Sequence, residues 1–523
     1  MNLIERNREY ALTDGKFGFS VNFADMKFEQ ADLDALSKKF AAAHKEMVKL
    51  EEGAIKNPDE NRQVTHFSDR LEYPKSKLFA QVEKFCSKVI AGKIKGSTGK
   101  KFKSVIVNGI GGSALGPQLM QFAINGPYWN ELPKSKRNGL KIYFLDNTDS
   151  AGFRDVLDVI DPENTLTLTI SKSGGTQETK NNLTAMENYY KELELDFSGH
   201  AVAITMRDSK LWKHAESAKW LKVLEMAESI GGRTSETSIV GHVPAAMAGI
   251  DFKAFLDGAI NMDEWTRKEK VLENPAYMMA AMWYIAGKGK GDRNMVIVPY
   301  SDRLILMSRY FQQLVMESIG KELDLDGKTV HQGINVFGNK GGTDAHAFIQ
   351  QLNDGRDDFF VTFIEVLKDA MPIPLDENMK MGDYLHGFQA GLVEALRSKG
   401  RQVIQMQIDE VSEFNLGMII ALYERAVAVY AELININAFH QPGVQAYKLA
   451  ANGILELREK VIGKLMEMEE VSGTATDIAA AVGMPEQEVE IAGLLDKAAE
   501  NCPCDAVSRE WDCKIGRWVY TVK

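Results

Sequence analysis

The sequence has few cysteines, no long apolar run and no excess of positive charge. Its 4 cysteines, three of them near the C-terminal end, are too sparse for a secreted disulfide scaffold and fit a reducing cytoplasm. No uncharged apolar run approaches the roughly 18 residues of a membrane span. Residues 1–30 lack the basic start and apolar core of a signal peptide. We therefore expect a cytoplasmic protein without a membrane partner.

Acidic residues outnumber basic ones by 73 to 62, giving a formal net charge of -11. An acidic surface binds polyanions poorly, so we expect no nucleic-acid partner, and any phosphate must be recognised locally. Hydrophobic residues make up 45% and charged residues 26% of the 523, as in ordinary globular proteins. At roughly 150 residues per domain, this length predicts about three to four domains, or fewer if one is large.

The middle of the chain alternates between strand-like and helix-like segments. Short β-branched runs bounded by Gly, Asp or Asn are expected to be strands, with helices between them. This alternation predicts a doubly wound parallel α/β sheet, followed by a second α/β unit of similar size. The expected strands are Ser104–Ile110, Lys141–Asp146, Thr165–Ile170 and Ala201–Thr205, then Asn294–Pro299, Phe359–Val366 and Gln402–Ile408.

Helical segments flank the two predicted units. Residues 1–100 look mainly helical and charged, and residues 250–290 are expected to be helical. A long amphipathic helix is predicted over Gly443–Met468, because apolar residues recur there at helical spacing. These apolar residues are Val444, Tyr447, Ala451, Ile454, Val461 and Leu465.

Beyond Val471 the pattern predicts a small separate module. Two short helices, Thr474–Val482 and Glu486–Glu500, are joined by a Gly-Met-Pro turn. Two strands, Val507–Cys513 and Arg517–Val522, would follow as a hairpin. The order of these elements is typical of a winged-helix-like fold.

The charge and cysteines of this tail disfavour two functions. Residues 461–523 hold 6 Lys and Arg against 12 Asp and Glu, a net charge of -6, and carboxylates open the second helix. DNA binding is therefore disfavoured, and a role in subunit contacts is preferred. Cys502, Cys504 and Cys513 lack a fourth nearby ligand for zinc, so reduced thiols are expected.

A glycine-rich loop, Gly109-Ile-Gly-Gly-Ser-Ala-Leu-Gly-Pro117, follows the first predicted strand and opens a helix. Glycines let backbone N–H groups approach an anion, and the N-terminus of a helix attracts it. The alternatives are a plain tight turn and the dinucleotide pattern Gly-x-Gly-x-x-Ala. Against the latter, no acidic residue ends a strand about twenty residues later.

A second loop, Ser171-Lys-Ser-Gly-Gly-Thr-Gln-Glu-Thr179, also lies between a strand and a helix. It places hydroxyls, an ammonium group and two glycines where the carboxyl ends of strands face a crevice. It lacks the Gly-Lys-Ser/Thr ending of a Walker loop. A capping loop is the alternative. Two such loops together favour a small phosphorylated ligand.

With four further segments in the same order, these loops resemble glucose-6-phosphate isomerases. The resemblance covers roughly residues 100–460 and leaves the tail unexplained. It implies two tandem sugar-isomerase (SIS) domains with helical arms, no cofactor, and a homodimer that shares its active sites. The six segments are Gly109–Pro117, Ser171–Thr179, Gly231–Arg233, Gln313–Lys321, Gly341–Leu352 and Phe439–Lys448.

The pattern and the resemblance together predict five parts. They are an N-terminal helical segment (1–100), a first SIS domain (101–255), a second SIS domain (256–430), a helical arm carrying a catalytic lysine (431–468) and the winged-helix-like tail (469–523).

Glu317 is the candidate base. Moving a proton between C1 and C2 of a sugar phosphate needs a carboxylate, an acid/base near the ring oxygen and positive charge beside the enediolate oxygens. A lone Glu is usually a surface residue, but the Gln-x-x-x-Glu-Ser-x-Gly-Lys block around this one matches the family. Gln313 and Glu317 are expected one turn apart, away from the stripe formed by Leu304, Met307, Phe311, Leu314 and Ser318.

His346 has a side chain suited to moving the ring-opening proton near neutral pH, although a structural histidine is the alternative. Lys448 follows Gln441 by seven residues, so both could point from one helix face.

The resemblance implies the other roles. His346 and Lys448 would open the sugar ring, with Glu178 orienting His346, and Arg233 would stabilise the enediolate. The implied substrate contacts are Gln313 and Gln441 at the sugar, Ser113, Ser171, Ser173 and Thr176 at the phosphate with Lys172 nearby, and Gly112 and Gly232 beside them.

One segment departs from the family. After Gly231-Gly232-Arg233 the family usually carries an aromatic residue and then Ser or Thr, whereas this chain has Thr234-Ser235. The wall of the sugar pocket is expected to differ there. The nine histidines are scattered without metal-binding spacing, so proton transfer through an enediol is preferred over a metal-assisted hydride shift.

Two other functions fit the sequence less well. A glucosamine-6-phosphate-forming isomerase would need an ammonia source, and no N-terminal nucleophilic Cys is present. A sugar-phosphate sensor would bind without turnover, but the joint presence of Glu317, His346 and Lys448 argues against it.

Overall fold

The computed structural model describes residues 1–468, 471–501 and 507–522. The chain forms two compact units, Met1–His440 and Gln441–Lys523. Each unit has its own hydrophobic core. In the described residues, no helix is long and apolar enough to cross a membrane.

A five-stranded parallel sheet organises the first half of the larger unit. Its strand order is β6-β5-β7-β8-β9. The four strands expected from the sequence are confirmed, within two residues at their ends, but β9 was missed. The five strands are β5 (Ser104–Asn108), β6 (Lys141–Leu145), β7 (Thr165–Ile170), β8 (Ala201–Thr205) and β9 (Lys222–Glu225).

Helices cover both faces of this sheet, as a doubly wound fold requires. On one face, Leu119 of α5 packs in the same core as Val105 and Val107 of β5. On the other face, Met186 and Leu211 pack with Ile106. The helices concerned are α5 (Leu115–Asn125), α6 (Ser150–Val159), α7 (Gln177–Glu192), α8 (Lys210–Ser217) and α9 (Ile239–Met247).

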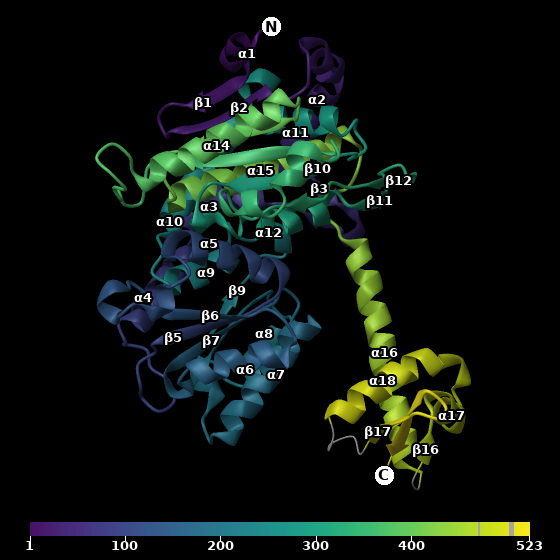
Figure 1. Ribbon diagram of the computed structural model, residues 1–523. Coiled ribbons are helices and arrows are strands. Elements are labelled where there is room, and N and C mark those ends of the chain that lie inside the picture. The colour runs from purple at the N-terminus through teal and green to yellow at the C-terminus, as the bar shows by residue number, and fades with distance from the viewer. Residues whose placement is uncertain (469–470, 502–506, 523) are drawn as a thin grey trace. The chain divides into compact units, whose positions relative to one another are not determined.

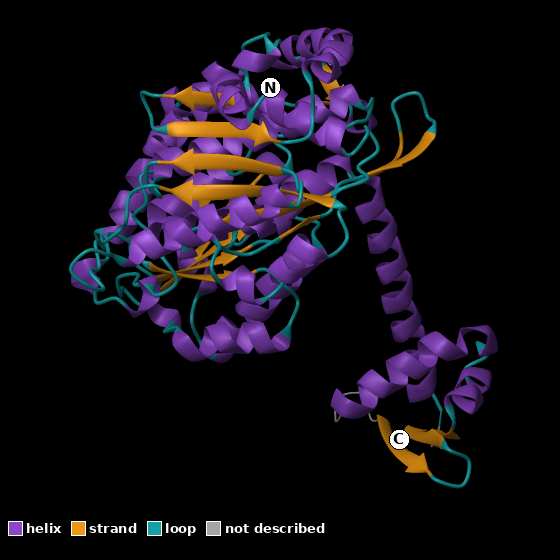
Figure 2. Cartoon of the chain, turned by 45° about the horizontal axis from the view of Figure 1, so that its top comes forward, coloured by secondary structure: helices purple, strands orange, loops and turns teal. Residues whose placement is uncertain are grey.

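A six-stranded sheet organises the second half, with helices on both sides (Figure 2). Four of its strands are parallel, in the order β15-β14-β10-β13. The three strands expected from the sequence are confirmed, and β13 was missed. The strands are β10 (Asn294–Pro299), β13 (Val336–Phe337), β14 (Phe359–Val366) and β15 (Val403–Ile408).

The remaining two strands of this sheet lie in the N-terminal segment, which was expected to be mainly helical. β1 (Ala11–Asp14) and β2 (Phe19–Asp25) form an antiparallel hairpin that pairs with β15 (purple at the top of Figure 1). The alternation Phe-Ser-Val-Asn-Phe in residues 19–23 is typical of a strand with one buried face, and it was overlooked. Phe19, Val21 and Phe23 are fully buried. Helices precede and follow this hairpin, so most of the first hundred residues are helical.

The other helices and hairpins complete the larger unit. They are α1 (Leu3–Tyr10), α2 (Gln30–Glu51), α3 (His66–Glu72), α4 (Lys77–Ile90), α13 (Ile349–Asp354), α14 (Met381–Ser398), and the short pairs β3 (Ile55–Asn57) with β4 (Arg62–Gln63) and β11 (Lys321–Leu323) with β12 (Thr329–Gln332).

Helix α15 (Glu413–Leu433) lies at the centre of the larger unit and is buried along nearly its whole length. It packs on α10 (Phe252–Thr266) and α11 (Pro275–Ala286), which lie in the segment 250–290 that was expected to be helical. Glycines allow the first contact: a Cβ on Gly258 would lie 1.8 Å from the carbonyl oxygen of Phe414, and one on Gly417 would lie 2.0 Å from that of Phe255. The expected domain boundary at residue 430 falls inside α15.

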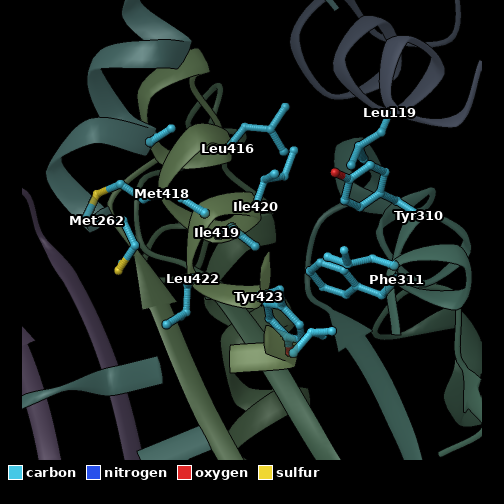
Figure 3. Close-up of a cluster of buried hydrophobic side chains, with 14 of the residues drawn as sticks. Leu119, Met262, Tyr310, Phe311, Leu416, Met418, Ile419, Ile420, Leu422 and Tyr423 are labelled. Atoms are coloured by element: carbon cyan, nitrogen blue, oxygen red, sulfur yellow. The ribbon is translucent and has the colours of Figure 1, made fainter. Parts of the chain in front are cut away.

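Phe311 and Tyr423 join α15 to the helix that leads to Glu317 (Figure 3). Their rings stack with centroids 3.7 Å apart and an interplanar angle of 19°. Phe311 belongs to α12 (Met307–Phe311) and is fully buried. The segment bearing the candidate base is therefore held against the central helix.

The smaller unit contains the long helix expected over Gly443–Met468 and the two helices and two strands expected for the tail, together with one strand, β16 (Val471–Gly473), that was not expected. The expected elements are α16 (Pro442–Met466), α17 (Ala475–Ala481), α18 (Glu488–Asn501), β17 (Val507–Asp512) and β18 (Arg517–Val522), and the sheet order is β16-β18-β17.

Two expectations about this unit need correction. The arm and the tail were placed in separate parts, but Val461 and Leu465 of α16 belong to the core formed by α17, α18 and the hairpin. Of the expected apolar stripe, these two are buried, whereas Tyr447 and Ile454 are exposed. Cys513 is exposed, and Cys502 and Cys504 lie outside the described residues. The winged-helix-like assignment stays a prediction.

Replacing Phe311 by Ala should lower the free energy of unfolding by about 3–5 kcal/mol, because the change leaves a cavity against Tyr423. Urea unfolding followed by fluorescence or circular dichroism measures this loss. Tyr128→Ala is the control, since Tyr128 is 75% exposed and its loss should cost little. Equal losses in the two variants would contradict this account of the core.

Candidate active site

Two loops rich in Gly and Ser meet at one edge of the first sheet. β5 and β7 are parallel neighbours, so their carboxyl ends lie side by side. After β5 a short 3-10 turn, Gly111–Ser113, leads into α5, and after β7 residues 171–176 lead into α7. The expected strand–loop–helix setting is confirmed for both loops.

The first loop touches two other predicted segments. A Cβ on Gly112 would lie only 1.8 Å from the carbonyl oxygen of Gly232, so the two backbones meet in direct contact. Ser235 Oγ fastens this contact by donating to the Gly112 carbonyl at 3.1 Å. Gly111 has a φ of +57°, and a Cβ there would lie 3.0 Å from Gln313 Nε2. Gly112, Gly232 and Gln313 are therefore brought together as expected.

Two hydroxyl groups of the second loop form hydrogen bonds within the loop. Ser171 Oγ accepts from the N–H of Gly174, and Ser173 Oγ accepts from the N–H of Gly175, both at 3.1 Å. The capping alternative is therefore partly right. Each hydroxyl keeps its proton for donation to an anion. Thr176, at the N-terminus of α7, makes no side-chain capping bond to the helix.

Lys172 connects the second loop to the Gly231–Arg233 segment. Its Nζ donates to the carbonyl oxygen of Ile230 at 3.2 Å. Burial, together with the nearby Arg62 guanidinium, lowers the pKa of Lys172 to about 8. A partly desolvated ammonium interacts strongly with any anion held by the loop.

A cavity of about 310 Å³ opens beside the second loop, between α7 and α8. Ser171, Gly174 and Thr176 line it, together with Leu183 and Leu211 of the two helices. The lining does not include Arg233 or Glu317, so this cavity lies apart from the charged pair described next.

Arg233 is buried and bound by several acceptors. Its side chain is 5% exposed. Nε donates to Ser318 Oγ at 2.8 Å, and Nη2 donates to the carbonyl oxygens of Ala438 and His440. Nη1 lies 3.4 Å from Glu317 Oε1. Burial lowers the pKa of Arg233, and the Glu317 carboxylate opposes this shift.

Glu317 ends a stretch of π-helix, Gln312–Glu317, that follows α12. The expected buried stripe is confirmed from Leu304 to Ser318, and Gln313 and Glu317 both stay partly accessible. The π-helix was not foreseen, because the helical spacing assumed 3.6 residues per turn. Such turns are rare and often occur at functional sites.

His346 and Glu178 are not in contact through any hydrogen bond or ion pair of the described residues. His346 is exposed, in the 3-10 turn Thr343–His346, and Glu178 lies in the first turn of α7. Asp344 anchors the turn by accepting from the backbone N–H of Asn339 at 2.9 Å. The role of Glu178 in orienting His346 stays a prediction.

Gln441 and Lys448 belong to the smaller unit. Lys448 is exposed on α16, in the second turn after its start at Pro442. Gln441 is the N-cap residue of this helix, with a φ of -146° and a ψ of 66°, so the expectation that the two side chains point from one helix face stays a prediction. Their approach to the other site residues stays a prediction.

Thr234 and Ser235 stand where the family usually carries an aromatic residue and a hydroxyl residue. Both are buried, and Ser235 Oγ donates to Gly232 as well as to Gly112. Ser235 therefore braces the loop contact. In the described residues, no group of three or more His, Cys, Asp or Glu side chains could hold a metal ion.

These features define a class of protein. The site combines a carboxylate beside an immobilised guanidinium with two loops that present hydroxyl and N–H groups. This combination is typical of a sugar-phosphate isomerase that works by proton transfer.

The comparisons with known proteins agree with this class. A model of the phosphoglucose isomerase family matches residues 23–402. The glucose-6-phosphate isomerase of Acaryochloris marina is 46% identical over 473 residues, 88% of each chain. That of Geobacter sulfurreducens is 43% identical over 514 residues, 95% of each chain. The chain therefore belongs to the phosphoglucose isomerase family.

The solved structures give the fold the same assignment. A glucose-6-phosphate isomerase from Chlamydia trachomatis matches with a TM-score of 0.75 at 25% identity, over 87% of this chain and 91% of its own. The coverage of 95% by the Geobacter relative also corrects one expectation, because it reaches into the C-terminal module that the resemblance seemed to leave out.

Replacing Gly112 by Ala should separate the first loop from Gly232, because the added methyl meets a carbonyl oxygen. We expect a loss of about 1–3 kcal/mol in unfolding free energy, measured by urea unfolding. Gly152→Ala is the matched control, since no atom lies within 4 Å of a Cβ there. A Gly112 variant as stable as the Gly152 variant would show that the loops do not pack this way.

Proposed function

We propose that this protein interconverts glucose 6-phosphate and fructose 6-phosphate by ring opening and proton transfer through a cis-enediol. The ion pair between Glu317 and Arg233 carries this proposal. In the forward direction Glu317 takes the proton from C2 of the open-chain aldose and returns it to C1 of the enediol. No electrons leave the substrate, so the step needs no redox cofactor.

Arg233 supplies positive charge where the enediolate oxygens develop negative charge. Since its other N–H groups are already bound to Ser318, Ala438 and His440, it does not have to reorient during the reaction. Gln313, beside Gly111, would contact the sugar from the same side.

The phosphate would lie at the paired loops. Ser113, Ser171, Ser173 and Thr176 supply hydroxyl donors, and Lys172 supplies charge without leaving its contact with Ile230. Gly112 and Gly232 carry no side chains that would block the substrate from reaching the ion pair.

Ring opening requires a second acid/base pair. We assign it to His346 and Lys448, with Glu178 orienting the imidazole and Gln441 contacting the sugar. The exposure of His346, without a partner among the described residues, fits a histidine that is completed by another subunit.

We further propose that the protein is a homodimer with shared active sites. The connection from β14 into α14 exposes a run of large apolar side chains, which a monomer would leave in water. A second copy of the chain is the occupant, as the family resemblance implies. The exposed residues are Leu367, Met371, Ile373, Leu375, Met381, Tyr384 and Phe388. Glycolysis and gluconeogenesis in the cytoplasm are the processes that such an isomerase serves, and the low cysteine content supports that location.

Glu317→Gln should lower kcat by about 10²–10⁴-fold, because the amide keeps the shape of the side chain but cannot accept the proton. The measurement follows fructose 6-phosphate conversion by EDTA-treated protein with a coupled glucose 6-phosphate readout. Glu322→Gln is the control, since Glu322 is exposed on the neighbouring strand and should keep full activity. Turnover that survives in the Glu317 variant would mean that another residue is the base.

Mixing the inactive variants Glu317→Gln and His346→Ala should restore activity if subunits share their sites. After the chains reassociate at random, half of the dimers are mixed, and one of their two sites has both residues intact. Roughly a quarter of the normal activity should then return. A mixture that stays inactive, although analytical ultracentrifugation shows subunit exchange, would exclude shared sites.

A further inference from the structure

Lys321 closes the helical segment that carries Glu317. Only 4% of Lys321 is exposed. Its Nζ donates to the carbonyl oxygens of Glu317 and Ser318, both at 2.7 Å. A helix end leaves carbonyl groups without intrahelical partners, and a cation there satisfies them and interacts well with the helix dipole.

Gly320 lets the chain turn sharply enough for this contact. Its N–H donates to the carbonyl oxygen of Met316 at 2.9 Å. A Cβ on Gly320 would lie 2.6 Å from the same oxygen, so a larger residue would push the turn open. The next residue, Lys321, begins β11 and pairs with Gln332, which fixes the direction from which its side chain returns to the helix.

The residues of the Glu-Ser-x-Gly-Lys block are therefore held in fixed positions relative to one another. Ser318 binds the Arg233 guanidinium through its hydroxyl and the Lys321 ammonium through its carbonyl group. Arg233 in turn faces the Glu317 carboxylate. A shift of the helix end would move the base and the guanidinium relative to each other.

The charges of these three groups also suit the reaction. Burial lowers the pKa of Lys321 to about 7, with the Arg233 charge acting in the same direction and the Glu317 carboxylate opposing it. Both cations are influenced by the Glu317 carboxylate, although only Arg233 forms an ion pair with it. When Glu317 accepts a proton, its carboxylate becomes neutral at the moment the enediolate becomes negative.

We propose that Lys321 is a positioning residue of the isomerase reaction, which holds the carbonyl groups of Glu317 and Ser318 and thereby fixes the base against Arg233. This rests on the proposed function. Lys321 acts through Glu317, because both of its hydrogen bonds go to the backbone of the helix end.

The test uses Lys321→Met, which keeps most of the length of the side chain but removes the N–H donors of the ammonium group. The control is Lys328→Met, on the exposed turn between β11 and β12. We expect kcat of Lys321→Met to fall at least about tenfold, with KM changed less than about twofold, since the phosphate contacts lie on other loops. Lys328→Met should match the unmodified protein.

A second readout separates positioning from general loss of structure. With glucose 6-phosphate deuterated at C2, a misplaced base makes proton transfer more rate-limiting, so the isotope effect on kcat should increase in Lys321→Met. Loss of folded protein would lower the active fraction and leave that isotope effect unchanged. Lys321→Gln, which keeps a shorter donor, serves if the Met variant does not fold, and the same increase is expected.

The outcomes are distinguishable. An unmodified protein without isomerase activity would contradict the proposed function and this proposal together. Full activity in Lys321→Met, or reduced activity with an unchanged isotope effect in both variants, would overturn the role of Lys321 and leave the proposed function intact.

Discussion

The buried guanidinium of Arg233 is the contact on which the site depends. Burying a cation is unfavourable unless its N–H groups find acceptors, and here they find them on distant parts of the chain. The hydroxyl of Ser318, the carbonyl groups of Ala438 and His440 and the carboxylate of Glu317 converge on it. The loop after the first sheet, the π-helix of the second half and the end of the larger unit are thereby fixed to one another.

Glycine makes that convergence possible. Gly112 and Gly232 meet backbone to backbone, which brings the phosphate-directed loop to within reach of the residue beside Arg233. The second loop joins the same arrangement through Lys172 and Ile230. Of the six segments that resemble the family, the first, third, fourth and sixth are linked directly, the sixth through the His440 carbonyl group, and the second is linked through Ile230. The segment around His346 makes none of these contacts, and we assign its role to the part of the site that another subunit completes.

The sequence predicted what depends on local pattern. Both parallel sheets, the two loops and the burial of the stripe ending at Ser318 follow from alternation, glycine placement and helical spacing. The alternation in residues 19–23 indicates a strand and was overlooked, and the pairing of its hairpin with β15, nearly 400 residues later, has no local signal. The sequence also did not predict the π-helix, because the expected spacing assumed an α-helix. The hydrogen bonds of Lys321 were not predicted either, because bonds from a side chain to backbone carbonyl groups produce no periodic pattern in the sequence. The pairing of Glu178 with His346 remains a prediction for the same reason: spacing along the chain does not determine which residues meet.

The crossing of α10 and α15 has a consequence for how this sequence can change over time. Gly258 and Gly417 each occupy a place where a carbonyl oxygen of the other helix would meet any larger residue. One substitution would push the helix axes apart, and a second at the partner position would then find space already made. The two sites are therefore coupled, so that their combined cost is smaller than the sum of the separate costs. Because of this coupling, the first substitution is the costly one and selection against it keeps both glycines in place. A sequence that already carried one substitution could accept the other at a smaller cost.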